Sequence, residues 1–258
     1  MTKTVMVTGA AAGIGRAIAL RFAGAGYRVG AYDVDIAGLV TLADELGDAV
    51  VTGSLDVRDP AQWRARLEEL TADSGGALHV LVNNAGILRS GAFSDIDLAD
   101  QQAIVDVNVT GVLNGCHTAH PYLRAARGAQ VVNLASASAI YGQPELATYS
   151  ASKFAVRGLT EALDLEWAAD RIRVTALWPL FVRTAMVDGM DTGATRSLGI
   201  HLTPDDVADA ALAVVRRPPR RFGSVHRAVG RQTRLLLASS QVTPSPLLRL
   251  MNRRIARM

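Results

Sequence analysis

The sequence predicts an α/β fold of the doubly wound type, with a parallel sheet of about seven strands and helices on both faces, in a single domain. Two observations predict it. Short runs rich in β-branched residues alternate with longer amphipathic stretches as far as residue 230, and no repeat or linker interrupts them. A glycine-rich turn at residues 9–15 joins the first run to the first amphipathic stretch. Strand–turn–helix units of this kind build parallel sheets with right-handed crossovers.

The expected elements alternate along the chain. Strands are expected over Thr4–Thr8, Arg28–Tyr32, Ala49–Ser54, Leu78–Val82, Gln130–Leu134, Ile172–Trp178 and Phe222–Val229. Helices are expected from Arg16, over Ile36–Leu46, Pro60–Ala72 and Leu98–Ala126, from Ala147 to about Ala168, and from Pro204 to about Arg216. Pro121 should break or bend the fourth helix, because proline lacks the N–H of the helical ladder. Leu180–Leu202 has weak periodicity and follows a strand end, so we expect a mobile lid over the substrate.

The composition limits the compartment and the class of protein. The 258 residues, 49% of them apolar, are enough for one large globular core. Cys116 is the only cysteine, so no internal disulfide can form and a cytoplasmic location is expected. We expect no signal peptide, since the N-terminus runs directly into a strand, and no apolar run approaches the roughly 18 residues of a membrane span.

Positive charge is concentrated at the C-terminal end. Residues 216–258 contain eleven arginines and no acidic residue, which leaves 16 basic (27 − 11) against 24 acidic side chains in residues 1–215. Residues 231–258 are therefore expected to form a basic amphipathic extension. It could make weak contact with an anionic membrane surface, or pack over the lid or a neighbouring subunit. Nucleic-acid binding is not expected, because the positive charge is the only feature of the sequence that would support it.

The glycine turn and the end of the second strand predict a dinucleotide site. Glycines let the backbone approach a pyrophosphate, and the following helix offers its free N–H groups. Asp33, at the strand end, could accept hydrogen bonds from ribose hydroxyls and would repel a 2′-phosphate. Neither Ala12 nor Val34 is basic, so NAD is favoured over NADP. The alternative is an aspartate that only caps a turn.

Tyr149 and Lys153 predict a proton-transfer pair. They lie four residues apart at the start of a helical stretch, which places them on one face, one turn apart. An ammonium beside a phenol stabilises the phenolate, so the pKa of Tyr149 should fall from about 10 toward neutrality. Alone, the spacing is also compatible with a surface pair.

Further motifs follow in order: Asp56-Val57, then Asn83-Asn84-Ala85-Gly86, Asn108 within a helix, and Ser136 thirteen residues before Tyr149. With them the chain resembles the short-chain dehydrogenase/reductase family, in its single-domain form of roughly 250 residues. The resemblance implies an NAD-binding, Rossmann-type catalytic domain over residues 1–230 with the lid at about 180–202. Its catalytic positions fall on Asn108, Ser136, Tyr149 and Lys153. Its cofactor-binding positions fall on Gly9, Gly13, Ile14, Gly15, Asp33, Asp56, Val57, Asn83, Ala85, Gly86, Tyr149, Lys153, Pro179 and Thr184.

The resemblance also implies roles for these residues. Tyr149 would take the hydroxyl proton as hydride leaves for NAD, or donate it in reduction. Lys153 would lower the pKa of Tyr149 and hold the nicotinamide ribose, and Ser136 would stabilise charge on the substrate oxygen. Asn108 would hold a water linking Lys153 to solvent. One position departs from the family: Leu180 stands where a glycine usually follows Pro179, which removes a permissive backbone position near the nicotinamide and places apolar bulk beside the substrate.

The expected function is interconversion of a secondary alcohol and its ketone with NAD(H). Apolar residues near the expected site, Leu88, Ile140, Leu180, Phe181 and Met186, suggest a lipophilic small-molecule substrate. Two alternatives are an NADPH-dependent carbonyl reductase and a non-enzymatic NAD-binding sensor or scaffold. A sensor would have no need of the tyrosine.

Two further expectations concern partners and metals. The family commonly pairs through the helices that would carry Asn108 and Tyr149, so a homodimer or homotetramer is expected. Phe154, Leu159 and Leu163 fit such a contact or could pack on the sheet. No metal is expected. His117 and His120 lie beside Cys116, but the sequence shows no third or fourth ligand for the two histidines.

Overall fold

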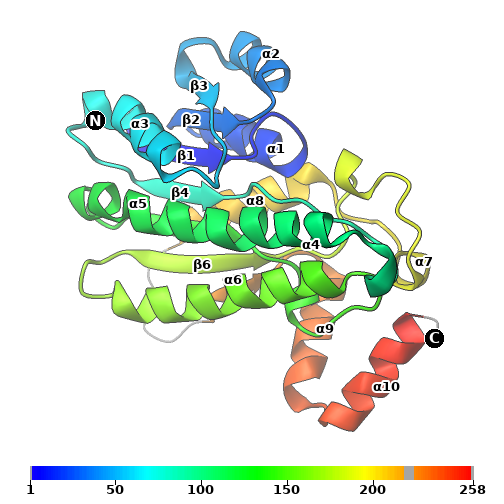
Figure 1. Ribbon diagram of the computed structural model, residues 1–258. Coiled ribbons are helices and arrows are strands. Elements are labelled where there is room, and N and C mark those ends of the chain that lie inside the picture. Colours follow the sequence, from blue (N-terminus) through cyan, green and yellow to red (C-terminus); the bar gives the residue numbers. More distant parts are fainter. Residues whose placement is uncertain (1, 218–223, 257–258) are drawn as a thin grey trace.

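Seven parallel strands form one sheet in the order β3-β2-β1-β4-β5-β6-β7 in the computed structural model, which describes residues 2–217 and 224–256 (Figure 1). The strands are β1 (Thr4–Thr8), β2 (Arg28–Asp33), β3 (Val50–Ser54), β4 (Val80–Asn83), β5 (Gln130–Leu134), β6 (Arg173–Trp178) and β7 (His226–Ala228). The order reverses between β1 and β4, and ligands of open α/β sheets bind at the carboxyl ends of strands beside such a reversal. The doubly wound fold is confirmed.

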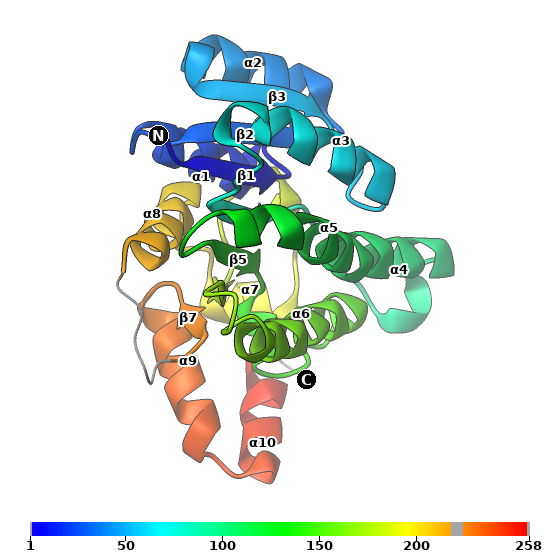
Figure 2. The same cartoon turned by 90° about the vertical axis from the view of Figure 1, so that its left-hand side faces the viewer.

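Helices cover both faces of the sheet (Figure 2). They are α1 (Gly13–Ala23), α2 (Ile36–Leu46), α3 (Pro60–Thr71), α4 (Leu98–Val105), α5 (Gly111–Ala125), α6 (Ala147–Glu166), α7 (Gly193–Leu198), α8 (Pro204–Arg216), α9 (Arg231–Val242) and α10 (Ser245–Ile255). Alternation along β1 shows the two layers. Val5 and Val7 pack with α1, α2 and α8, whereas Met6 packs with α3, α5 and α6. Both faces of the strand are buried, so its three central residues, Val5, Met6 and Val7, are all apolar.

The long helical stretch is irregular at Asn108 and not at Pro121. A π-helical turn, Asp106–Thr110, lies between α4 and α5, and α5 then continues past Pro121 to Ala125. The expected break at Pro121 is therefore wrong. The carbonyl that the missing N–H would have bonded belongs to His117, an exposed residue, so water can satisfy it.

The end of the chain differs in detail from the expectation. β7 covers only His226–Ala228 of the expected strand, and Phe222 lies outside the described residues. The lid segment contains α7 and is closed at its ends by a bridge between Val182 and Leu202. Its mobility stays a prediction.

Residues 231–256 form two helices that project from the body as a hairpin, α9 and α10 (Figures 1 and 2). α10 packs against α7, as the interpretation of a tail lying over the lid requires. Its opposite side exposes Leu247, Leu250 and Arg254, so contact with a membrane surface stays a prediction. Within residues 2–217 and 224–256, no helix combines the length and apolar character needed to cross a membrane.

Gly15 holds α1 close to the first strand, and we predict that Gly15→Ala strongly destabilises the fold. A Cβ there would overlap the Gly9 carbonyl oxygen and come 2.5 Å from Asn84 Nδ2. Overpacking against backbone costs about 1–3 kcal/mol or more in free energy of unfolding, which urea denaturation measures. Gly24→Ala, at the other end of α1, is the control, because its Cβ would meet Leu20 O at 3.4 Å and Arg21 O at 3.9 Å, which are ordinary contacts. Equal stability of the two variants would refute the close approach.

Candidate active site

A cavity of about 590 Å³ opens at the carboxyl ends of the strands. Its walls come from the segments that follow six of the strands, β1 to β6, and it extends from the glycine turn to the lid. Of the expected site residues, it is lined by Gly9, Gly13, Ile14, Asp33, Asp56, Val57, Ala85, Gly86, Ser136, Tyr149, Lys153, Pro179 and Thr184. The chain therefore brings most of the predicted residues around one space.

The glycine turn is fixed by the segment after β4. Gly9 and Gly13 have φ angles of +66° and +54°, which favour glycine. Asn84 Nδ2 donates to the carbonyl oxygens of Thr8 (2.9 Å) and Gly9 (3.1 Å), and Thr8 Oγ1 accepts from the N–H groups of Asn84 and Ala85. These bonds leave the turn preorganised for an anion beside the N-terminus of α1. Sequence analysis did not single out Asn84, although it stands inside the motif.

Asp33 faces the cavity and also holds the turn. Its carboxylate accepts hydrogen bonds from the N–H groups of Ala11 (3.0 Å) and Asp35 (3.1 Å). Asp33 therefore does cap a turn, as the alternative interpretation of the sequence proposed, and it also faces the cavity. A carboxylate offers roughly four acceptor positions, so two remain for ligand hydroxyls.

Arg58 is a cavity residue that sequence analysis missed. Its Nε lies 2.9 Å from Asp56 Oδ1 and its Nη2 2.6 Å from Asp56 Oδ2, and these charge-assisted bonds hold the pKa of Asp56 below its usual value. The guanidinium is thus already bound to a carboxylate. Its signal in the sequence was only its position, two residues past the aspartate.

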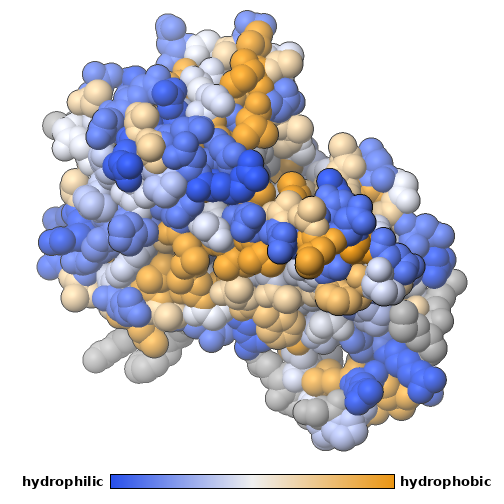
Figure 3. Space-filling model, viewed as in Figure 1, coloured by the Kyte–Doolittle hydropathy of each residue, from blue (hydrophilic) through white to orange (hydrophobic). Residues whose placement is uncertain are grey.

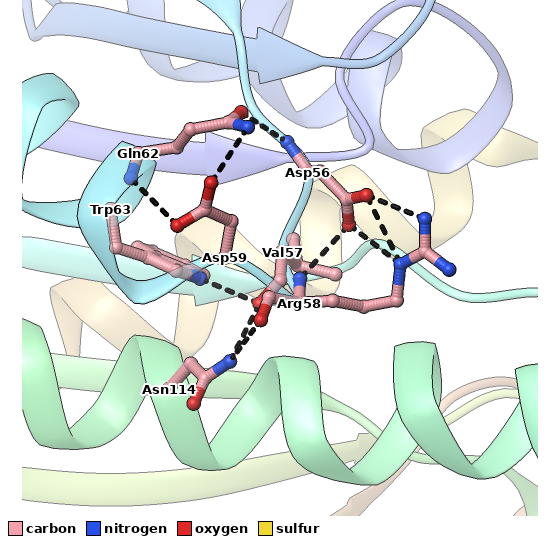
Figure 4. A network of polar contacts seen from close by, with 7 residues as sticks. All are labelled: Asp56, Val57, Arg58, Asp59, Gln62, Trp63 and Asn114. Carbon is pink, nitrogen blue, oxygen red and sulfur yellow. Dashed lines mark hydrogen bonds and ion pairs between the residues drawn. The ribbon is translucent and has the colours of Figure 1, made fainter.

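The loop after β3 is held by a network that fixes this wall of the cavity (Figure 4). Trp63 Nε1 and Asn114 Nδ2 both donate to the Val57 carbonyl oxygen, at 2.9 and 3.1 Å. Asp59 caps α3 by accepting from Ala61 N, as its position before Pro60 predicted. Two helices of the same layer, α3 and α5, therefore position Val57 against the cavity.

Asn83 does not line the cavity, and its expected contact with a cofactor stays a prediction. Its side chain is 3% exposed and points into the sheet layer, where Nδ2 donates to Asn133 Oδ1 at 2.9 Å and lies 3.4 Å from Cys116 Sγ. Neighbouring residues at a strand end point to opposite faces, so Asn84 occupies the position toward the turn. Gly15 is likewise not a wall of the cavity and serves the packing of α1.

Ser136, Tyr149 and Lys153 meet at the other end of the cavity. Lys153 is 5% exposed. Its Nζ donates to the Leu134 carbonyl oxygen at 2.8 Å and lies 5.4 Å from the centre of the Tyr149 ring. Ser136 Oγ lies 3.2 Å from Ser138 Oγ, which in turn donates to Gln143 Oε1. Ser138 and Gln143 thus orient the Ser136 hydroxyl.

Burial controls the ionisation of this pair. It raises the pKa of Tyr149 to about 12, although a hydrogen bond with Ser136 opposes the rise, and it lowers the pKa of Lys153 to about 8. The expectation that the pKa of Tyr149 falls is therefore not met in the protein alone. Desolvation of the phenolate outweighs the hydrogen bond with Ser136.

Asn108 lies in the π-helical turn and is fully buried. Its Oδ1 accepts from Ile87 N at 2.8 Å, and its Nδ2 donates to Ile87 O and Ser152 Oγ. These bonds satisfy a costly buried amide and fix the segment after Gly86. The side chain thus joins the cavity wall to α6, and its role in holding a water stays a prediction.

The lid side of the cavity is apolar. Leu88, Leu180, Phe181 and Met186 line it, while Ile140 packs behind them in the same apolar cluster. Pro179 O accepts from Ala137 N at 2.8 Å, and Thr184 lies against Gly13, so the lid reaches both ends of the site. An apolar wall beside Tyr149 suits a lipophilic ligand.

The described part of the chain holds no cluster of three or more His, Cys, Asp or Glu side chains suited to a metal ion. His120 instead bonds Asp170 at 2.9 Å, and burial raises the pKa of the Cys116 thiol to about 12.

Comparison with known proteins places these residues in context. The family model described as short chain dehydrogenase matches residues 3–195. A 3-alpha-(or 20-beta)-hydroxysteroid dehydrogenase of Mycobacterium bovis is 35% identical over 84% of this chain and 78% of its own. A 3alpha-hydroxysteroid dehydrogenase of Mediterraneibacter gnavus is 37% identical over 81% and 88%. A crystal structure of a 3-ketoacyl-(acyl-carrier-protein) reductase from Brucella melitensis, complexed with NADH, superimposes with a TM-score of 0.79 at 32% identity, over 88% of this chain and 95% of that one.

Proposed function

Because the chain belongs to the short-chain dehydrogenase family, we propose that it is an NAD(H)-dependent oxidoreductase that interconverts a lipophilic secondary alcohol and its ketone. One observation carries the proposal. Ser136, Tyr149 and Lys153 stand at one end of a cavity whose other end presents the glycine turn and Asp33. Such a cavity can hold an extended dinucleotide with its reactive ring beside the three side chains.

The residues of the chain would divide the proton chemistry among them. NAD, when bound, supplies the hydride acceptor, and NADH the donor. Tyr149 removes the hydroxyl proton during oxidation and returns it during reduction. Lys153 keeps a positive charge beside the ring, and Ser136 donates a hydrogen bond to the substrate oxygen as its charge changes. The resemblance also assigns the nicotinamide ribose to Lys153.

The preferred substrate is proposed to be a ring alcohol of about the size of a steroid. The apolar wall of Leu88, Leu180 and Phe181 supports it, as do two relatives whose names identify them as hydroxysteroid dehydrogenases. Incubation with NAD and a series of secondary alcohols, from cyclohexanol to the 3α-hydroxysteroid androsterone, tests the proposal by NADH formation. No NADH from any alcohol, with NADH binding intact, would leave the sensor or scaffold alternative.

Asp33 is proposed to select NAD over NADP, and we predict that Asp33→Asn relaxes this choice. The amide keeps an oxygen for the Ala11 or Asp35 N–H but removes the charge that repels a 2′-phosphate. The ratio of NADPH to NADH affinity should rise about tenfold or more, equivalent to about 1.4 kcal/mol. Fluorescence titration with both cofactors measures it.

Asp35→Asn is the matched control, because Asp35 caps α2 through Gly38 N and does not line the cavity. It should leave the ratio unchanged. Arg58 is the one basic side chain among the cavity walls near this end, and its pairing with Asp56 supports NAD. Tighter binding of NADPH than of NADH by the unmodified protein would favour the carbonyl-reductase alternative.

Assembly through α4, α5 and α6 is also proposed. Apolar residues gather on this side of the molecule (Figure 3), where Val105, Leu113 and Phe154 are 39–45% exposed. Leu159 and Leu163 pack against the apolar cluster of this layer but are only partly buried, so their part in such a contact stays a prediction. Phe154→Ser should shift a dimer or tetramer toward monomer in sedimentation.

A further inference from the structure

The C-terminal hairpin reaches the substrate side of the cavity without lining it. Leu236 on α9 and Ile255 on α10 belong to the apolar cluster that also contains Leu180, Phe181 and Tyr149. None of the hairpin residues stands among the cavity walls. Any influence on the substrate must therefore pass through the elements between them.

Two amides of the hairpin bind those elements. Asn252 Nδ2 on α10 donates to the Gly142 carbonyl oxygen at 2.6 Å, in the loop between Ser136 and Tyr149. Gln232 Nε2 on α9 donates to the Leu198 carbonyl oxygen at 3.2 Å, at the end of α7. Each helix of the hairpin thus holds one backbone segment of the substrate side.

The loop and α7 are in turn joined to each other and to α10. Glu145 Oε2 accepts from Gly193 N at 2.8 Å, and Gly193 lies so close to α10 that a Cβ would overlap Ala256 O. The same loop carries Gln143, which accepts the Ser138 hydroxyl and bonds Ser150 Oγ through its N–H. A continuous set of contacts therefore runs from α10 to the hydroxyl groups beside Tyr149.

We propose that Asn252 and Gln232 are positioning residues, through which the hairpin fixes the 139–146 loop and α7 and so sets selectivity for bulky over small secondary alcohols. The inference rests on the proposed function. A bulky ligand must press on Leu180 and Phe181, which the loop, α7 and the hairpin support from behind. A small alcohol would contact only the residues around Tyr149.

The test compares two variants with a control on the same helix. Asn252→Asp has the same shape but places an oxygen against the Gly142 oxygen, and Gly193→Ala forces the end of α10 away from α7. For each, KM for androsterone should rise about tenfold, the equivalent of one hydrogen bond of about 1.4 kcal/mol. The kcat with cyclohexanol and the Kd for NADH should stay within about twofold. Arg249→Gln, at an exposed position of α10, should change none of these values.

Hydrogen exchange supplies a readout that does not depend on turnover. Amides of residues 139–146 and 193–199 should exchange faster in both variants, and those of β1 and α1 should not. Unchanged exchange and unchanged KM would overturn the proposal. So would an equal loss of kcat on both alcohols together with weaker NADH binding, since that indicates general destabilisation. If the unmodified protein oxidises no alcohol, the proposed function fails, and the exchange data alone still decide whether the hairpin holds the loop.

Discussion

Tyr149→Phe should lower kcat for alcohol oxidation by about 10³-fold or more, because it removes the hydroxyl that we propose accepts the substrate proton. The aromatic ring remains, and with it the packing against Leu180 and Phe181. The Kd for NADH should therefore stay within about twofold of the unmodified value, by fluorescence titration, since the substitution removes one oxygen atom and leaves the glycine turn and Asp33 unchanged.

Tyr122→Phe controls for the general effect of losing a phenol. Tyr122 lies near the end of α5 and does not line the cavity, so its variant should keep full activity. If Tyr149→Phe retained activity comparable to that of the control, Tyr149 could not be the general base, and the proposed proton transfer would be wrong.

Lys153→Met should lower kcat/KM for oxidation at neutral pH by about 10²–10⁴-fold and change its pH dependence. In the proposed mechanism the reactive pair is phenolate with ammonium, which carries one proton fewer than the fully protonated pair. Burial places the pKa of Lys153 at about 8 and that of Tyr149 at about 12, so the pair loses its first proton near pH 8. Below that pH the rate should rise about tenfold per pH unit, and above it the rate should level off.

Without the lysine, the phenol alone must ionise, so the rise should continue to much higher pH. Steady-state kinetics between pH 5.5 and 10 distinguish the two profiles. Reduction should follow the opposite trend, because there Tyr149 must start protonated. A profile for Lys153→Met that levels off near pH 8 would show that Lys153 is not part of the titrating pair.

The sequence could predict the sheet and the cofactor end because the signals there are local. Apolar runs that are buried on both faces mark the strands, and the glycines with positive φ mark the turn. The position of Asp33 could be predicted because it ends its strand. These features depend on a few neighbouring residues, which a single sequence contains.

Other features depend on packing that sequence alone does not contain. Asn83 and Asn84 are the same residue type, and only the direction of β4 in the sheet decides that Asn84 faces the glycine turn. The spacing of Tyr149 and Lys153 shows an attractive charge but not the burial that outweighs it. Pro121 was expected to disrupt the helix because the sequence does not show that His117, whose carbonyl loses its partner, is exposed to water.

The hairpin shows the same limit. Its arginines and leucines predicted an amphipathic segment, but its contact with α7 depends on Gly193, which stands 63 residues (256 − 193) before its neighbour Ala256. No local pattern connects the two segments. The sequence predicted an amphipathic extension and left open whether it lies over the lid, on a neighbouring subunit or on a membrane surface.

Transfer of deuterium tests the central claim most directly. A set of secondary alcohols deuterated at the carbinol carbon, including androsterone and cyclohexanol, is incubated with the protein and NAD, and the nicotinamide product is analysed by mass spectrometry. The proposed function predicts one deuterium in NADH for each ketone formed from at least one of these alcohols, and almost none with Tyr149→Phe. Absence of labelled NADH with every alcohol, while NADH still binds, would contradict it.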